Sequence, residues 1–187
     1  MITALDKNTG LVLIDLQKGV VKLPPADVVN KIVQNVVKLV DAFHRAGLPV
    51  IVVNVNPAYS KSSTSRKDAP PTNRAFFEGD SLDIIPEIKT EPGDIFITKH
   101  TWGAFYETPL DEELKKRDIT GIVLAGISTS IGVEGTARQA SELGYNITFA
   151  KDAMSDSVPE AQDRSLKYIF PRMGEVGDTD QIIEKLS

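Results

Sequence analysis

The sequence predicts an α/β protein, a three-layer α/β/α sandwich with a mostly parallel, doubly wound sheet of five or six strands. Three observations predict this fold. Short continuous apolar runs recur along the chain, segments of helical period lie between them, and glycines follow two of these segments just before the next run. Continuous hydrophobicity is typical of strands that are covered on both faces, and the alternation of strand and helix is typical of a parallel sheet.

The apolar runs predict the strands. In chain order they are 10-GLVLID-15, 49-PVIVVNV-55, 94-DIFITK-99, 121-GIVLAG-126, 146-NITFAK-151 and a weaker run, 173-MGEVG-177. All of these runs are far too short to span a bilayer. The helical segments are 28–46, 109–116, 131–143, 159–168 and 179–186. Gly47 and Gly144 end two of them, as expected at helix C-termini.

The long segment 56–93 interrupts this alternation. It contains five of the eleven prolines, and only Ile84 and Ile85 suggest a short helical turn. Long insertions without regular structure in compact domains are usually functional or disordered. The segment follows the second predicted strand, so we expect it to overhang the carboxyl edge of the sheet. We interpret it as a substrate lid or an oligomer contact within a single domain, 1–187.

Composition narrows the possible functions. A chain of 187 residues fits one domain. Its net charge of −5 argues against nucleic-acid or membrane partners. The opening 1-MITALDKNTG-10 has no apolar run long enough for a signal peptide, so we expect a cytoplasmic protein. The absence of cysteine excludes disulfides, thiolate metal sites and cysteine nucleophiles.

Polar residues close the predicted strands. Asp15 ends the first strand, Lys99 ends the third, and a junction of small residues, 126–132, follows the fourth. Ligands of open parallel sheets bind outside the carboxyl ends of the strands. Taken singly, each charge fits a structural ion pair or a solvated strand end equally well. Together with the small-residue junction, the two charges favour a functional site.

Other candidates surround this edge. Gln17 is predicted to hydrogen-bond a substrate or the lid, and Trp102 and Phe105 either wall the pocket or pack in the core. Asp152 is expected to order its loop. His44 and His100 are isolated, and no Asp-x-His pattern that would supply two metal ligands occurs, so no metal site is expected. No organic cofactor is expected either. The 126–132 junction lacks the spacing and the lysine of a phosphate-binding loop.

Three segments carry a family resemblance. They are 11-LVLIDLQ-17, 98-TKHTWGAFYETPLDEEL-114 and 124-LAGISTSIGVEGTARQASELGYNITFAKDA-153. In order and spacing they resemble the isochorismatase-like hydrolases, a superfamily that includes nicotinamidases and N-carbamoylsarcosine amidohydrolases. The resemblance implies a catalytic Asp, Lys and Cys triad, in which Asp15 and Lys99 match the first two members. Gly132 stands where the cysteine would be.

Members of that superfamily with cysteine at this position and members with glycine there catalyse reactions by different mechanisms. Cysteine members cleave amides through a thioester, whereas isochorismatases proper resemble this chain in having glycine there. They hydrolyse a vinyl ether without a covalent intermediate. By resemblance, Asp15 is the acid/base and must have a raised pKa, Lys99 is its partner, and the backbone at Ile131 and Gly132 is the oxyanion or water site. Well-defined isochorismatases have an aromatic hydroxyl four residues before the glycine, where this chain has Ser128, so the substrate stays unassigned.

Two alternatives remain open. A hydroxyl of Ser128, Thr129 or Ser130 can replace the thiol if Asp15 or Lys99 takes its proton, although these hydroxyls equally suit capping of the next helix. A non-catalytic binding protein that has lost its thiol is the other alternative. The predicted substrate-binding residues are Gln17, Trp102, Phe105, Ser128, Ser130 and Ile131.

The resemblance also implies a cis peptide bond at Ile127–Ser128, a small-molecule substrate and a homo-oligomer, either a dimer or a tetramer.

Overall fold

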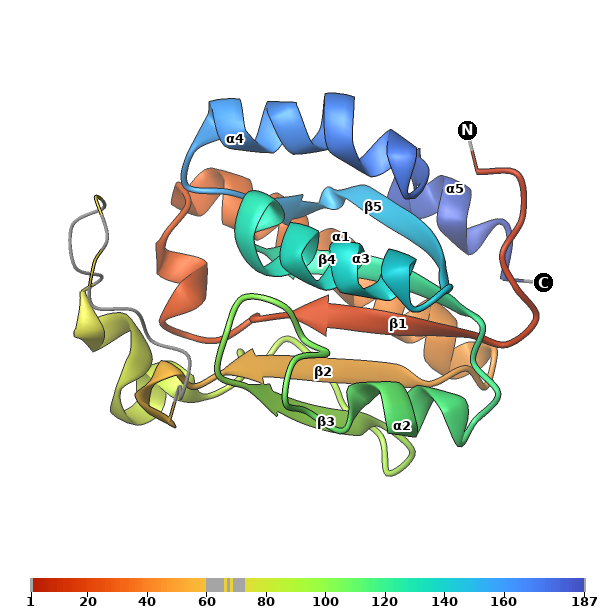
Figure 1. Ribbon diagram of the computed structural model, residues 1–187, viewed down its shortest axis with the longest axis horizontal. Helices are drawn as coiled ribbons and strands as arrows, with labels where there is room; N and C mark the ends of the chain where they lie inside the picture. Colours follow the sequence, from red (N-terminus) through yellow and green to blue (C-terminus); the bar gives the residue numbers. More distant parts are fainter. Residues whose placement is uncertain (1, 60–65, 67, 69–72, 187) are drawn as a thin grey trace.

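In the computed structural model, which describes residues 2–59, 66, 68 and 73–186, six parallel strands form one sheet (Figure 1). The strands are β1 (Thr9–Ile14), β2 (Val50–Val55), β3 (Ile95–Lys99), β4 (Gly121–Ile127), β5 (Asn146–Ser155) and β6 (Gly174–Gly177). Their spatial order is β3-β2-β1-β4-β5-β6. The chain therefore winds outward twice from the centre, and the two halves meet between β1 and β4.

Helices cover both faces of the sheet, which confirms the predicted α/β sandwich. They are α1 (Ala26–Arg45), α2 (Leu110–Lys115), α3 (Glu134–Glu142), α4 (Pro159–Arg164) and α5 (Thr179–Ile183). Figure 1 shows α2 and α3 in front of the sheet and α1 behind it. Strand β1 alternates between the two cores: Leu11 and Leu13 belong to the core under α1, and Val12 and Ile14 to the core under α2 and α3. Burial on both faces explains the continuous apolar runs.

The 56–93 segment is structured where it is described. It contains the 3₁₀ turns Pro57–Tyr59, Arg74–Phe77 and Gly79–Leu82. The helical turn that we predicted at Ile84 and Ile85 is wrong. Ile84 instead forms an isolated antiparallel bridge with Gln17, and Ile85 is buried in the core under α1. Residues 60–65, 67 and 69–72 of the predicted lid lie outside the described residues.

A close approach of backbones brings β4 against the end of β1. Gly126 has a φ of 122°, and a Cβ there would lie 2.1 Å from the carbonyl oxygen of Ile14. Only glycine fits, because any side chain would collide with the neighbouring backbone. The pairing of β4 with β5 also shifts register between Leu124 and Gly126. The turn that follows β4 therefore begins directly beside the end of β1.

Candidate active site

A buried ion pair lies at the carboxyl edge of the sheet. Lys99 Nζ lies 2.7 Å from Asp15 Oδ2, and the two side chains are 2% and 8% exposed. The ammonium also donates to the carbonyl oxygen of Thr101 at 3.1 Å. Strand β3 lies two positions from β1, roughly 10 Å at the usual strand spacing, so the long lysine side chain is needed to reach the carboxylate. The convergence predicted from two separate strand ends is present.

The backbone of Asp15 directs its side chain into the site. Strand β1 ends at Ile14, one residue earlier than predicted, and Asp15 has a φ of 52°. This left-handed conformation is uncommon outside glycine, and aspartate is among the residues that adopt it most readily. The Asp15 N–H still donates to Val53 O at 2.9 Å, which keeps the residue attached to β2.

Burial shifts the protonation equilibrium of Asp15 towards the acid. Burial raises the pKa of the Asp15 carboxyl from 3.8 to about 6, although the charge and hydrogen bond of Lys99 act to lower it. Desolvation penalises the carboxylate more than the single cation stabilises it. The raised pKa that an acid catalyst requires is therefore present. The sequence left this balance undecided.

Gly132 lies beside this pair. A Cβ at Gly132 would lie 3.2 Å from Asp15 Oδ2 and 2.8 Å from Ile14 Cγ2. A side chain at this position would therefore project directly at the Asp15 carboxylate, as the resemblance implied for a cysteine. With glycine the position offers no attacking atom.

The turn after β4 carries Gly132 and has an unusual start. The Ile127–Ser128 peptide bond is cis, as the resemblance implied. A π-helical turn, Thr129–Val133, follows and leads into α3. The capping role that we considered for the hydroxyls is wrong at Ser128, which occupies the N-cap position without a side-chain cap bond. Its carbonyl oxygen accepts from the N–H groups of Ile131 and Val133 instead.

Asp156 holds this turn in place, and sequence reasoning missed it. Its Oδ2 accepts from both the N–H and the hydroxyl of Ser130 at 2.8 Å, and its Oδ1 accepts from Val158 N. We expected the fifth strand to end at Lys151, but β5 continues to Ser155. Asp156 is thus a strand-end residue, and the rule that found Asp15 and Lys99 would have found it had the end of the strand been placed correctly.

Two buried polar atoms in the described residues have no hydrogen-bond partner. They are Asp15 Oδ1 and Thr129 Oγ1. Leaving such an atom unpaired costs about 1–3 kcal/mol, so native proteins rarely do it without a reason. Both atoms belong to residues at the carboxyl edge, one just after β1 and one just after β4. This arrangement is typical of a site that is completed by a ligand or by water.

Gln17 contacts the lid segment. Its Nε2 donates to the carbonyl oxygens of Val55 and Leu82, and its Oε1 accepts from Val55 N. The side chain is fully buried. Of the two roles predicted for Gln17, these bonds fit the contact with the lid segment and leave its amide engaged with backbone groups.

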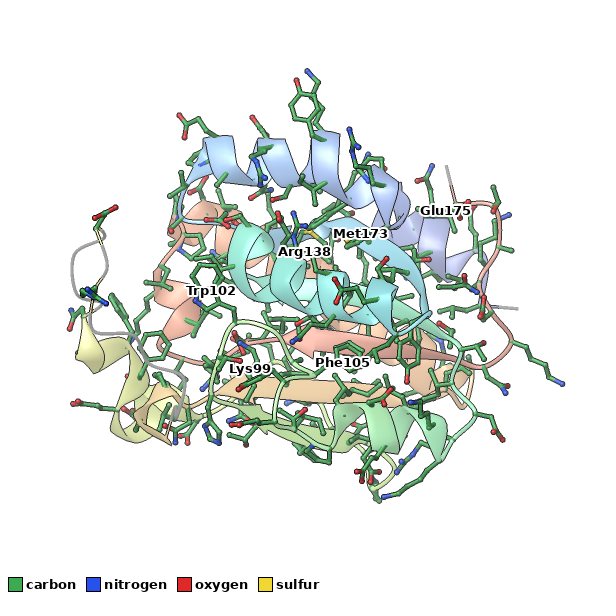
Figure 2. All side chains as sticks on the ribbon, in the orientation of Figure 1. Lys99, Trp102, Phe105, Arg138, Met173 and Glu175 are labelled. Atoms are coloured by element: carbon green, nitrogen blue, oxygen red, sulfur yellow. The ribbon has the colours of Figure 1, made fainter. Side chains whose placement is uncertain are left out.

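The two aromatic residues that we considered for the pocket wall, Trp102 and Phe105, lie apart from each other in the structure. Trp102 is 67% exposed and its backbone lies against Gly135 near the start of α3. Phe105 packs on Tyr145, with ring centroids 5.7 Å apart, in the core under α2 and α3. Figure 2 places Lys99 and Trp102 towards one end of the sheet and Phe105 further along it. The structure therefore gives Phe105 the packing role and does not bring it to Asp15.

Neither histidine lies in a metal cluster. His44 Nε2 lies 3.0 Å from Asp94 Oδ1, and His100 Nδ1 lies 2.7 Å from Asn56 O. In the described part of the chain, no group of three or more His, Asp or Glu side chains is arranged to hold a metal ion. Asp152 lies inside β5 and not in the loop where we expected it, and its Oδ1 accepts from the N–H and hydroxyl of Thr179. No described helix is long and apolar enough to cross a membrane.

A cavity of about 440 Å³ lies at the opposite, amino edge of the sheet. Its lining includes His44, Leu48, Pro49, Asp94, Arg117 and Ile119. Asp94 uses both carboxylate oxygens, one towards His44 and the other as acceptor from Glu91 N at 2.8 Å. This amino-edge cavity is far from the ion pair, because it opens where the strands begin.

Comparison with known proteins agrees with the fold. The Isochorismatase domain family model matches residues 9–181. The uncharacterized isochorismatase family protein YwoC of Bacillus subtilis is 41% identical over 96% of this chain and 95% of its own length. The ureidoacrylate amidohydrolase RutB of Acinetobacter baylyi is 29% identical over 95% of this chain and 83% of its own. The structure of an isochorismatase family protein from Burkholderia thailandensis is similar with a TM-score of 0.90 and 38% identity, covering 100% of this chain and 99% of that one.

Proposed function

The chain belongs to the isochorismatase family of hydrolases, and from this premise we propose that it hydrolyses a small metabolite by direct addition of water. Asp15 is the acid/base, Lys99 is its charge-stabilising partner, and Gly132 leaves room for the water. The observation that carries the proposal is the buried Asp15 and Lys99 pair facing the space where a Gly132 side chain would stand. A site without a nucleophile but with a buried acid suits water addition better than covalent catalysis.

For a vinyl ether the steps balance as follows. The Asp15 carboxylic acid gives its proton to the terminal enol carbon, and the double bond becomes an oxocarbenium ion. Water adds to the oxocarbenium carbon and returns a proton to the Asp15 carboxylate. The hemiketal then collapses to a ketone and an alcohol. For a substrate such as isochorismate the ketone is pyruvate.

Lys99 supports both halves of this cycle. While Asp15 is ionised, the ammonium 2.7 Å away stabilises the carboxylate, and with its remaining N–H it orients an anionic substrate group. The Ile131 N–H already donates to Ser128 O. We therefore assign the Gly132 N–H, rather than that of Ile131, to the water or the developing oxyanion.

Two alternatives have distinct signatures. A serine-dependent amidase would release ammonia, and RutB, a relative, is an amidohydrolase. In this chain, however, Ser130 Oγ is bonded to Asp156 at 2.8 Å, and that contact fixes the turn. A non-catalytic binding protein would release neither ammonia nor pyruvate. We also expect a homo-oligomer, dimer or tetramer, which sedimentation measures, and a cytoplasmic location.

The test is substitution of Asp15 with a matched control. Isochorismate, ureidoacrylate and other small amides are incubated with the protein, and pyruvate and ammonia are measured separately. Asp15→Asn keeps the size of the side chain but removes the proton, so turnover is expected to fall by about 100-fold or more. Asp94→Asn, another buried aspartate, serves as control at the amino edge. Equal turnover in parent and Asp15→Asn would show that Asp15 is not the acid.

A further inference from the structure

Two threonines near the site are equally buried but differently bonded. Thr129 and Thr136 are both 0% exposed. Thr136 Oγ1 donates to Gly132 O at 2.7 Å and accepts from Ala104 N at 3.1 Å. Thr129 Oγ1 has no hydrogen-bond partner among the described residues. Two side chains of the same type, seven residues apart, therefore differ in whether the protein itself satisfies the hydroxyl.

Thr129 lies on the inward side of the π-helical turn. Within that turn Thr129, Gly132 and Val133 are buried, whereas Ile131 is exposed. The Cβ direction of Gly132 points at Asp15, with 3.2 Å between an ideal Cβ and Oδ2. Thr129 and Gly132 belong to the same five-residue turn, which directly follows β4, and β4 lies beside β1 in the sheet. Thr129 is therefore buried at the same strand ends as Gly132 and Asp15.

We propose that Thr129 is a substrate-binding residue, whose hydroxyl donates a hydrogen bond to a carboxylate or carbonyl oxygen of a small ligand held beside Asp15. The inference rests on the proposed function, because it uses the same pocket. An oxygen-bearing ligand fits, since the nearby Lys99 ammonium favours anionic groups and a hydroxyl supplies one directed donor. The hydroxyl has no partner within the described residues, so a ligand oxygen would satisfy it.

The first test needs no substrate. Thermal unfolding is measured for Thr129→Val and Thr136→Val, which replace a hydroxyl by a methyl group of similar size. Thr136→Val loses two hydrogen bonds and is expected to unfold roughly 3–6 °C below the parent. Thr129→Val removes an unsatisfied hydroxyl and is expected to unfold at or above the parent temperature. A loss in Thr129→Val as large as that in Thr136→Val would overturn the inference.

The second test measures the ligand. Isochorismate and ureidoacrylate, two small carboxylates, are titrated into the parent, Thr129→Val and Thr129→Ser, and KM and kcat are measured for the compound that is hydrolysed. We expect Thr129→Val to weaken binding and raise KM by about tenfold, with a smaller change in kcat. Thr129→Ser keeps the donor and should restore most of the affinity. Parent-like affinity in Thr129→Val would refute the assignment.

The two proposals fail separately in this design. If Asp15→Asn keeps its turnover while Thr129→Val loses affinity, the assignment of the acid is wrong and Thr129 still binds the ligand. If Asp15→Asn loses turnover while Thr129→Val matches the parent in affinity, only the inference about Thr129 falls.

Discussion

The two edges of the sheet treat their buried aspartates in opposite ways. At the amino edge, Asp94 is bonded through both oxygens, to His44 and to the N–H of Glu91. At the carboxyl edge, Asp15 shares Oδ2 with Lys99, and its Oδ1 has no hydrogen-bond partner within the described residues. Thr129, in the turn after β4, also has a buried side-chain oxygen without a partner in the described residues.

The unsatisfied polar atoms support our proposal that the site lies at the carboxyl edge, whereas the open space lies at the amino edge. The cavity of about 440 Å³ lies at the amino edge, where polar groups hold α1 to the turn before β3. The carboxyl edge instead keeps buried polar atoms without partners, at an energetic cost that folding alone would not maintain. We therefore expect substitutions at the two edges to separate stability from turnover.

The largest effect is expected for Lys99→Met, which leaves Asp15 buried without its cation. Breaking a buried pair in this way costs about 3–5 kcal/mol of unfolding free energy. The cost should be greatest at pH 8 and smaller at pH 5, where Asp15 takes up a proton and no longer bears a charge. Turnover should fall by about 100-fold or more. Denaturant unfolding at both pH values and a turnover assay check this, and a loss of stability that is equal at both would argue against a charged Asp15 at high pH.

The pH dependence of turnover tests the role of Asp15 next. The pKa of its carboxyl is raised to about 6 by burial. If Asp15 is the acid, kcat/KM should fall by about tenfold per pH unit above this pKa. A profile that rises through the same region would assign a base role instead.

The same group also links stability to pH. Its folded pKa of about 6 exceeds the unfolded value of 3.8, so the folded state binds more protons between these values. This contribution therefore lowers the free energy of unfolding as pH rises through that window and stays constant below it. In Asp15→Asn this contribution to the pH dependence of the unfolding free energy should disappear. An unchanged pH dependence of unfolding in this variant would place the raised pKa elsewhere.

Gly132→Ala should lower both turnover and stability. The added Cβ would lie 3.2 Å from Asp15 Oδ2, where we place the water, and 2.8 Å from Ile14 Cγ2, a branch methyl of a fully buried side chain. We expect turnover to fall by about tenfold. The contact with Ile14 should lower the unfolding free energy by about 1–3 kcal/mol, an effect that the gain in helix propensity only partly offsets. Turnover equal to that of the parent would show that the water lies elsewhere.

Asp94→Asn should have the smallest effect on turnover, because it changes the amino edge alone. Weakening the contact with His44 should cost about 1–2 kcal/mol of stability. Turnover should stay within about twofold of the parent, since no group of the site touches Asp94. A parallel loss of turnover would show that the two edges are coupled and would break the comparison.

The fold could be predicted because burial on both faces leaves a continuous apolar signal. Strand β1 and helix α1 are clear examples. Strand β5 shows the limit, since Lys151 and Asp152 lie inside it and suggested that it had ended. Contacts with Asp178 and Thr179 satisfy these residues in the folded chain. Such long-range partners are invisible to a local pattern, and the misplaced strand end concealed Asp156.

The residues of the candidate site could be predicted from the strand ends and from the family resemblance. The energetics of the site could not. Asp15, Lys99 and Gly132 could be named because the carboxyl ends of parallel strands converge. The pKa of Asp15 required the balance of burial against one cation, and the unpaired hydroxyl of Thr129 required a full account of hydrogen bonds. Phe105 could not be assigned from its proximity to Lys99 in sequence, because the chain turns away between them to pack against α3.

Lys99 pairs with Asp15 at the end of β1, but it comes from β3, the outermost strand on that side of the sheet. Strand β3 has only β2 as a neighbour, and Lys99 is its last residue. If β3 separated from β2, the Lys99 ammonium would leave the site. The Asp15 carboxylate would then remain in apolar surroundings without its cation. The proposed catalytic pair thus depends on a peripheral strand, and a hydrogen-exchange experiment on the amides of β3 would report how often that strand opens.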